Sequence, residues 1–130
     1  MSHHILIADD ELLMRRLLTL ILETDGYKVT AVADGVHVIP AMEANKPDLV
    51  ICDIMMPMMD GLAVLEEVKK KPLLCEVPFI VITAAGSPVY SEEALALGAA
   101  QCIFKPFAKA EILKAVHEFL PSGSPGVDGV

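Results

Sequence analysis

The sequence predicts a doubly wound α/β fold, in which helices cover both faces of a parallel β-sheet. Continuous apolar runs at 5–8, 49–52 and 79–83 lack polar alternation, which is typical of strands buried on both faces of such a sheet. Weaker strand signals occur at 27–32 and 100–104. Segments of helix length separate the five runs, and this regular alternation favours parallel strands joined by crossover helices.

The first expected helix covers 11–24, and Gly26 is expected to end it because glycine readily adopts the positive φ of a C-cap. Its apolar stripe is expected to face the sheet and comprises Leu13, Leu17, Leu20, Ile21 and Thr24. The second expected helix, 35–45, contains Pro40. An interior proline costs about 3 kcal/mol, so this helix is either bent or regular only from Pro40 onward.

Three further helices are expected at 61–71, 89–97 and 109–120, the second of them ended by Gly98. The lysines that end the first of these suit the negative pole of a helix dipole and are interpreted as a solvated terminus. Residues 1–120 are expected to form one domain, and 121–130 are interpreted as a flexible tail or truncated linker. Inward positions follow helical spacing in the helices at 61–71 and 109–120: Leu62, Leu65, Val68, Ile112, Leu113, Val116 and Leu120.

The chain has 130 residues and a formal net charge of −8. This acidity argues against a basic surface for nucleic acid or for anionic lipid. No apolar run approaches the roughly 20 residues of a membrane-spanning helix. The cysteines show no metal-binding spacing and are interpreted as reduced, packed thiols of a cytoplasmic protein: Cys52, Cys75 and Cys102.

Polar side chains stand where four of the five expected strands end. In an open α/β sheet, ligands bind beyond the carboxyl ends of the strands, so these side chains are expected to share one crevice. Two like charges about 4 Å apart repel by roughly 4 kcal/mol at an effective dielectric constant near 20. A divalent cation would relieve this repulsion, and an all-oxygen donor set suits Mg²⁺ or Mn²⁺. The residues concerned are Asp9, Asp10, Asp53, Thr83 and Lys105.

A carboxylate can also act as a nucleophile toward phosphorus and form an acyl phosphate. Asp53 ends the central expected strand and is the candidate for this role. The hydroxyl of Thr83 and the ammonium of Lys105 would complete a clamp around the phosphoryl group. The residue pattern therefore indicates a site that holds a phosphoryl group on Asp53.

These residues, taken in order, resemble the receiver domain of two-component response regulators of the chemotaxis-regulator type. The motifs that carry the resemblance are the acidic pair 9–10, the segment 53–61 (Asp-Ile-Met-Met-Pro-Met-Met-Asp-Gly), Thr83 and the Lys-Pro-Phe segment 105–107. The resemblance covers about residues 3–120. It implies a flavodoxin-like fold with strand order 2-1-3-4-5 and five flanking helices, and a cis peptide bond after Lys105.

For phosphoryl transfer, the resemblance implies that Asp53 accepts the group from a phosphohistidine on a sensor histidine kinase or a histidine phosphotransfer protein. Thr83 would donate a hydrogen bond to one phosphoryl oxygen, and Lys105 would pair with another. The domain would not be an enzyme toward other substrates, since it would catalyse only its own phosphorylation and slow dephosphorylation. It would then act on a downstream protein target or on an output domain.

For the metal, the resemblance implies direct Mg²⁺ ligation by Asp10, Asp53 and the backbone carbonyl of Met55. Asp9 would act mainly through a metal-bound water. Asp60, which precedes Gly61, is interpreted as a turn residue and helix N-cap and not as a further ligand.

One position departs from the family pattern, because Cys102 stands where Tyr or Phe often occurs three residues before the lysine. A thiol is too small to report phosphorylation by swinging a ring, so the signal is expected to travel through residues 84–97. Met55 and Ala85 flank the site, and neither side chain can hold a water for attack on the acyl phosphate. Slow self-dephosphorylation is therefore expected.

Three other functions would fit part of this residue pattern. A phosphatase of the haloacid dehalogenase type also uses an Asp nucleophile with Mg²⁺, but it needs a second Asp where this chain has Met55. A flavodoxin-like electron carrier needs a Ser/Thr/Gly-rich phosphate loop, whereas residues 9–11 are acidic. A receiver-like module that is never phosphorylated stays open. Whether the chain acts as a stand-alone regulator or as part of a larger protein stays open too.

Overall fold

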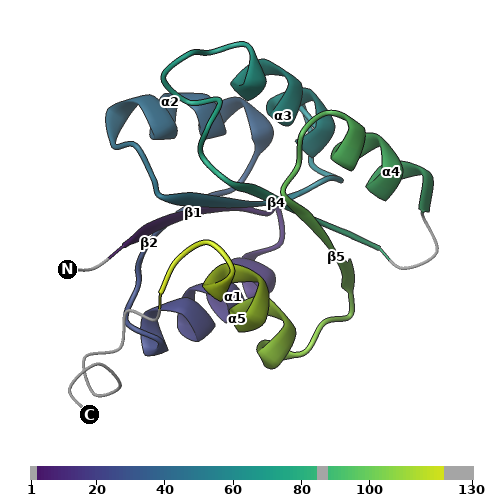
Figure 1. Ribbon diagram of the computed structural model, residues 1–130. Helices are drawn as coiled ribbons and strands as arrows, with labels where there is room; N and C mark the ends of the chain where they lie inside the picture. Colours follow the sequence, from purple (N-terminus) through teal and green to yellow (C-terminus); the bar gives the residue numbers. More distant parts are fainter. Residues whose placement is uncertain (1–2, 85–87, 122–130) are drawn as a thin grey trace.

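A five-stranded sheet lies at the centre of the computed structural model, which describes residues 3–84 and 88–121 (Figure 1). Neighbouring strands pair in parallel in the order β2-β1-β3-β4-β5, which confirms the predicted strand order. Every predicted strand boundary is correct within one residue. The strands are β1 (His4–Ala8), β2 (Lys28–Val32), β3 (Leu49–Asp53), β4 (Phe79–Ala84) and β5 (Gln101–Lys105).

Helices cover both faces of this sheet, with α2, α3 and α4 on one face and α1 and α5 on the other (Figure 1). A short 3₁₀ helix precedes α2. Within the described ranges, no helix has the length and apolar character needed to cross a membrane. The helices are α1 (Leu12–Thr24), the 3₁₀ helix (Gly35–His37), α2 (Val38–Ala44), α3 (Gly61–Lys69), α4 (Pro88–Ala96) and α5 (Lys109–His117).

Strand β3 explains why the apolar runs of the sequence show no alternation. All five of its residues are buried. Val50 and Cys52 belong to the core beneath α2, α3 and α4, whereas Leu49 and Ile51 belong to the core beneath α1 and α5. Because side chains alternate between the two faces of a strand, two cores require apolar residues at successive positions.

The predicted inward stripe of α1 is wrong except at Ile21, which is buried. Leu13 is 78% exposed and Leu20 is 65% exposed, whereas Leu18 and Leu22 are buried. Apolar residues surround much of this helix, so two stripes compete for the sheet. The stripe that packs inward runs through positions 14, 18, 21 and 22, which have the i, i+4, i+7, i+8 spacing of one helix face. Several leucines are consequently left on the surface.

Gly26 ends α1 as predicted, and the backbone geometry shows why a glycine is needed there. Its φ is 92°, a left-handed conformation that side chains with a Cβ disfavour. The N–H of Gly26 donates to the carbonyl of Glu23 at 3.0 Å, and that of Tyr27 donates to the carbonyl of Leu22 at 3.1 Å. These two bonds form a Schellman motif, which satisfies carbonyls that the helix leaves free.

The helix that contains Pro40 matches neither of the two alternatives that the sequence left open. The segment begins as a 3₁₀ turn at Gly35, and the α-helix starts at Val38. Pro40 is therefore in the first helical turn, where a backbone N–H has no partner within the helix and its absence costs little. Gly35 is packed so closely that a Cβ there would overlap the carbonyl group of Met59.

Hydrogen bonds join the residues just after α5 to the turn between α1 and β2. The Tyr27 hydroxyl donates to the carbonyl oxygen of Pro121 at 2.8 Å and lies 3.3 Å from that of Leu120. Burial, helped by the charge of Asp25, raises the pKa of Tyr27 to about 12. The exposed His117 contacts the same turn, because its Nε2 lies 2.8 Å from Asp25 Oδ2.

The remaining differences concern helix ends and the tail. Helix α3 ends at Lys69 and not at residue 71, and Lys69 is not simply solvated because its Nζ donates to the Cys75 carbonyl at 2.9 Å. Helix α5 ends at His117, three residues earlier than expected. The three cysteines are free thiols, as predicted. Of the expected tail 121–130, residues 122–130 lie outside the described ranges.

Candidate functional site

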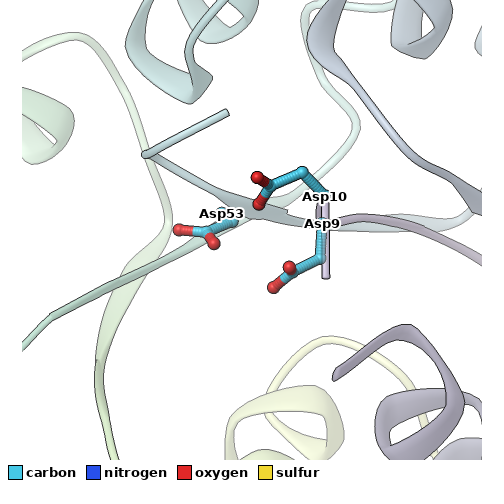
Figure 2. Close-up of side chains that lie close together, drawn as sticks. All are labelled: Asp9, Asp10 and Asp53. Atoms are coloured by element: carbon cyan, nitrogen blue, oxygen red, sulfur yellow. The ribbon is translucent and has the colours of Figure 1, made fainter. Parts of the chain in front are cut away.

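Three carboxylates meet at the carboxyl ends of the two central strands, β1 and β3 (Figure 2). Asp9 is 1% exposed and Asp53 is 5% exposed, whereas Asp10 reaches solvent. One oxygen from each of the three groups lies within 4.8 Å of the others. The cluster follows from strand register, since Ala8 pairs with Cys52 and the next residue on each strand is an aspartate.

The loop between β3 and α3 packs closely against the backbone of Asp53 and Ile54. Asp60 caps α3 by accepting a 2.8 Å hydrogen bond from the N–H of Ala63, which confirms its predicted role as an N-cap. The N–H of Gly61 donates to the Ile54 carbonyl at 2.8 Å, and a Cβ at Gly61 would overlap the Asp53 carbonyl oxygen. A glycine is therefore required for α3 to start so close to the carboxylate cluster.

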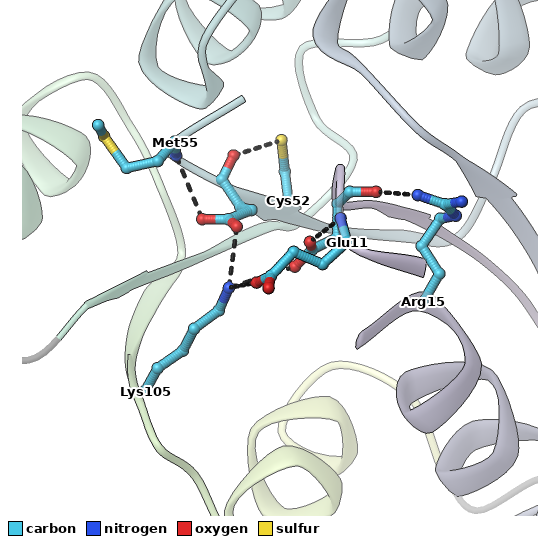
Figure 3. A network of polar contacts seen from close by, with 7 residues as sticks. Glu11, Arg15, Cys52, Met55 and Lys105 are labelled. Carbon is cyan, nitrogen blue, oxygen red and sulfur yellow. Dashed lines mark hydrogen bonds and ion pairs between the residues drawn. The ribbon is translucent and has the colours of Figure 1, made fainter. Parts of the chain in front are cut away.

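Lys105 brings a positive charge into the cluster from the end of β5 (Figure 3). Its Nζ lies 2.9 Å from Asp53 Oδ2 and 3.4 Å from Asp9 Oδ2. Burial alone would lower the pKa of Lys105, but the hydrogen bond and charge of Asp53, together with the charge of Asp9, raise it overall. The ammonium therefore stays protonated. The Lys105–Pro106 peptide bond is cis, as predicted.

Thr83 presents a buried hydroxyl that has no hydrogen-bond partner among residues 3–84 and 88–121. The residue is 1% exposed, and its Oγ1 makes no hydrogen bond among the described residues. It comes one residue after Ile82, which pairs with Asp53 across the sheet. Buried hydroxyls are nearly always hydrogen-bonded, because an unpaired one costs about 1–3 kcal/mol. A ligand oxygen bound at the adjacent carboxylates would satisfy this group.

The site carries more negative than positive charge. Burial raises the pKa of the Asp9 carboxyl, and the charge of Asp53 adds to this effect, although the Glu11 N–H and Lys105 oppose it. The clustered carboxylates of Asp9, Asp10 and Asp53 outnumber the single ammonium of Lys105, and every ligand atom that they offer is an oxygen. This donor set fits Mg²⁺, a cation that prefers carboxylates, carbonyls and water.

The structure therefore brings together the predicted residues Asp9, Asp10, Asp53 and Lys105, and it places Thr83 on the neighbouring strand. Met55 also lies against the site, because its N–H donates to Asp53 Oδ1 at 3.2 Å. Its side chain is 58% exposed.

Cys102 is half-buried and packs against the core beneath α2, α3 and α4. Burial raises the pKa of its thiol, which disfavours the thiolate form. The expected signalling segment 84–97 is described in part only. Residues 85–87, including Ala85, lie outside the described ranges.

Two contacts at the site escaped the sequence-based predictions. The Glu11 carboxylate lies 3.7 Å from Lys105 Nζ, and Arg15 Nη1 donates to the Asp9 carbonyl at 2.8 Å. Both residues lie at the start of α1, where acidic and basic side chains are ordinary surface features. They lie at the site because β1 pairs with β3. This pairing joins segments far apart in the chain, so local sequence does not reveal it.

Known proteins are similar to this chain over most of its length. A family model described as the response regulator receiver domain matches residues 5–117. The chain is 36% identical over 121 residues to the chemotaxis protein CheY of Bacillus subtilis, which covers 92% of this chain and 99% of that protein. It is 35% identical over 116 residues to the probable transcriptional regulator ycf27 of Cyanophora paradoxa, which covers 89% of this chain and 47% of that regulator. The chain thus spans about half the length of the ycf27 regulators it matches.

A solved structure shows the same likeness in three dimensions. The receiver domain of the sensor histidine kinase PA1611 from Pseudomonas aeruginosa PAO1, with a magnesium ion coordinated in its active site cleft, matches with a TM-score of 0.82 and 27% identity. The match covers 92% of this chain and 98% of that chain. Together with the family match over residues 5–117, this likeness shows that the chain belongs to the receiver domains of two-component response regulators.

Proposed function

We propose that Asp53 is the phosphoacceptor of this receiver domain and that its phosphorylation requires Mg²⁺. The observation that supports this most strongly is the convergence of Lys105 and two further carboxylates on Asp53. On the neighbouring strand, the buried Thr83 hydroxyl has no partner in the part of the chain that the structure describes. An aspartate that only pairs with Lys105 needs neither a metal site nor a further hydrogen-bond donor nearby. A phosphoryl group on Asp53 has several oxygens, which would use the charge of a bound metal and the hydroxyl of Thr83.

In the proposed reaction, a carboxylate oxygen of Asp53 attacks phosphorus and forms a P–O bond while the P–N bond to the donor histidine breaks. Lys105 neutralises charge on one phosphoryl oxygen, and Thr83 donates a hydrogen bond to another. Asp10, Asp53 and the Met55 carbonyl would hold Mg²⁺, with Asp9 acting through water. Bound Mg²⁺ would supply charge neutralisation at the phosphoryl oxygens.

The domain would catalyse this transfer and the slow loss of the group, and nothing else. Met55 cannot hydrogen-bond an attacking water through its thioether, which supports a long-lived acyl phosphate. We place the domain in the cytoplasm, in keeping with its three free thiols. Residues 1–120 would be the switch, and the phosphorylated form would present an altered surface to a downstream protein or to an output domain.

The proposal is tested by exposing the chain to acetyl phosphate with and without Mg²⁺. We expect one hydroxylamine-labile phosphoryl group per chain, formed only with Mg²⁺ and located on Asp53 by borohydride reduction and peptide mass spectrometry. Beryllofluoride with Mg²⁺ should shift the amide resonances of residues around Asp53 and Thr83. A chain that takes up no phosphoryl group, or takes it up on another residue, contradicts the proposal.

The exposed leucines of α1 favour docking of a histidine-bearing partner next to this site. Leu13 is 78% exposed and Leu17 is 44% exposed, and α1 starts directly after the acidic pair. A groove of about 380 Å³ continues this surface toward Phe107 and Lys109, which follow Lys105. Contiguous exposed apolar surface beside polar groups is typical of protein interaction sites. We therefore assign the partner, a histidine kinase or a histidine phosphotransfer protein, to this surface.

Leu13→Glu should lower the rate of phosphotransfer from such a partner about tenfold or more, because a charge replaces an apolar contact at the interface. Phosphorylation by acetyl phosphate should stay within about twofold of wild type, since the site itself is untouched. Leu73→Glu is the matched control, because Leu73 is 80% exposed and lies in the connection between α3 and β4. Equal transfer rates for the two variants, measured by rapid quench, would refute the assignment of the docking surface.

A further inference from the structure

Glu11 is the residue immediately before α1, yet its side chain does not cap the helix. It holds the N-cap position, where Ser, Thr, Asp and Asn usually accept a hydrogen bond from the first helical turn. Its carboxylate makes no such bond. Instead, Oε1 lies 3.7 Å from Lys105 Nζ, and the Glu11 N–H donates to Asp9 Oδ1 at 2.9 Å (Figure 3). The side chain is thus directed to the phosphorylation site.

The three acidic partners of Lys105 differ in their access to solvent. Asp9 and Asp53 are buried, and they lie 3.4 Å and 2.9 Å from the ammonium. The Glu11 side chain is 67% exposed, whereas that of Lys105 is 21% exposed. Glu11 therefore adds a negative charge on the solvent side of the ammonium, at the rim of the site.

This charge matters for the approach of a phosphoryl donor, because every such donor is an anion. A carboxylate at the rim repels an incoming anion and also competes for the ammonium that would attract it. The effect acts within about one Debye length, roughly 8–10 Å at ordinary ionic strength. Charges at the rim of a binding site mainly change association rates and their dependence on salt.

This repulsion affects small free phosphodonors more strongly than phosphohistidine on a protein. A small free donor such as acetyl phosphate depends on its own charge to reach the site. A phosphohistidine on a protein is brought there by contacts elsewhere, such as those of the exposed α1 leucines. The rim charge therefore penalises the small donor more than the docked one.

We infer that Glu11 is a specificity-determining residue, which disfavours free, multiply charged small-molecule phosphodonors relative to phosphohistidine on a docked protein. The inference rests on the proposed phosphorylation of Asp53. It assigns Glu11 no part in binding the metal, since its carboxylate pairs with Lys105 and is absent from the group of three clustered acids.

The test compares two small donors of different charge on wild type and on Glu11→Gln, with Mg²⁺ present. Near neutral pH, acetyl phosphate is a dianion, whereas phosphoramidate carries one net negative charge. Removing the rim charge should raise the rate with acetyl phosphate about two- to fivefold, as for other exposed charges. The rate with phosphoramidate should rise clearly less. High salt, on the order of 0.5 M, should erase the difference because it shortens the Debye length to a few ångström.

Glu23→Gln is the matched control, since it makes the same change near the other end of α1, about 18 Å away along the helix. It should leave both donor rates as in wild type. Glu11→Gln should also keep the wild-type melting temperature and Mg²⁺ affinity, measured by calorimetry, and should shift the NMR resonances of the Lys105 ammonium.

An unchanged ratio of the two donor rates in Glu11→Gln would overturn the inference, as would a clear loss of Mg²⁺ affinity, which would make Glu11 a metal ligand. Wild-type protein that accepts no phosphoryl group from either donor would overturn the proposed function itself. The two failures are therefore distinguishable in one experiment.

Discussion

Asp53→Asn is expected to lower Mg²⁺-dependent phosphorylation by acetyl phosphate about 10³-fold or more, which in practice abolishes it. An amide oxygen is too weak a nucleophile to form the acyl phosphate, and the neutral side chain removes one of the three charges that would hold the metal. The fold should survive, because Asn has the shape of Asp and its single side-chain oxygen can still accept one of the two hydrogen bonds that the Asp53 carboxylate accepts on separate oxygens from the Met55 N–H and from Lys105 Nζ. Mass spectrometry measures the phosphoryl content, and circular dichroism verifies the fold.

Asp60→Asn provides the control for this variant. It makes the same chemical change in the same loop, and Asn caps helices about as well as Asp. It should therefore retain phosphorylation and stability. Normal phosphoryl uptake by Asp53→Asn would show that another residue is the acceptor.

Gly35→Ala is expected to lower the free energy of unfolding by about 2–3 kcal/mol, the upper part of the usual range for an overpacked interior. The added methyl group would overlap the Met59 carbonyl, with its Cβ within 2.7 Å of the carbonyl carbon. Backbone on both sides has little room to yield, since Gly35 is buried and Met59 immediately precedes the capped start of α3. Urea unfolding monitored by circular dichroism measures the change.

This substitution should also slow phosphorylation, because Met59 belongs to the loop that returns the chain beneath Asp53. Val36→Ala is the neighbouring control. Val36 is 43% exposed, so its truncation should cost clearly less than the change at Gly35. A loss of less than about 0.5 kcal/mol in Gly35→Ala, the usual effect of a surface substitution, would mean that the close approach to Met59 relaxes freely.

The strands could be predicted from sequence because β3 and its neighbours are buried on both faces. Such strands leave a continuous apolar signal that does not depend on knowing the partner strand. Helix α1 shows the limit of the same reasoning. Its leucines offer two apolar stripes, and only packing against the sheet decides that Leu18 and Leu22 turn inward while Leu13 and Leu20 stay in solvent.

The candidate site was predictable for a related reason. Each polar residue follows a strand, and parallel strands end at one edge, so Asp9, Asp53 and Lys105 had to meet there. The contact between Glu11 and Lys105 was not predictable in this way. It depends on the direction of an exposed side chain at a helix start, which neither periodicity nor strand order determines.

The hydrogen bonds of Tyr27 to the carbonyls of Leu120 and Pro121 fix the position of the end of the described chain relative to Asp53. Strand β3 spans about 17 Å, with Asp53 at one end, and the anchored carbonyls of Leu120 and Pro121 belong to the opposite end of the sheet. A domain joined beyond Pro121 would therefore connect at the end of the sheet opposite to Asp53, whereas a separate protein could bind directly at the edge where Asp53 lies.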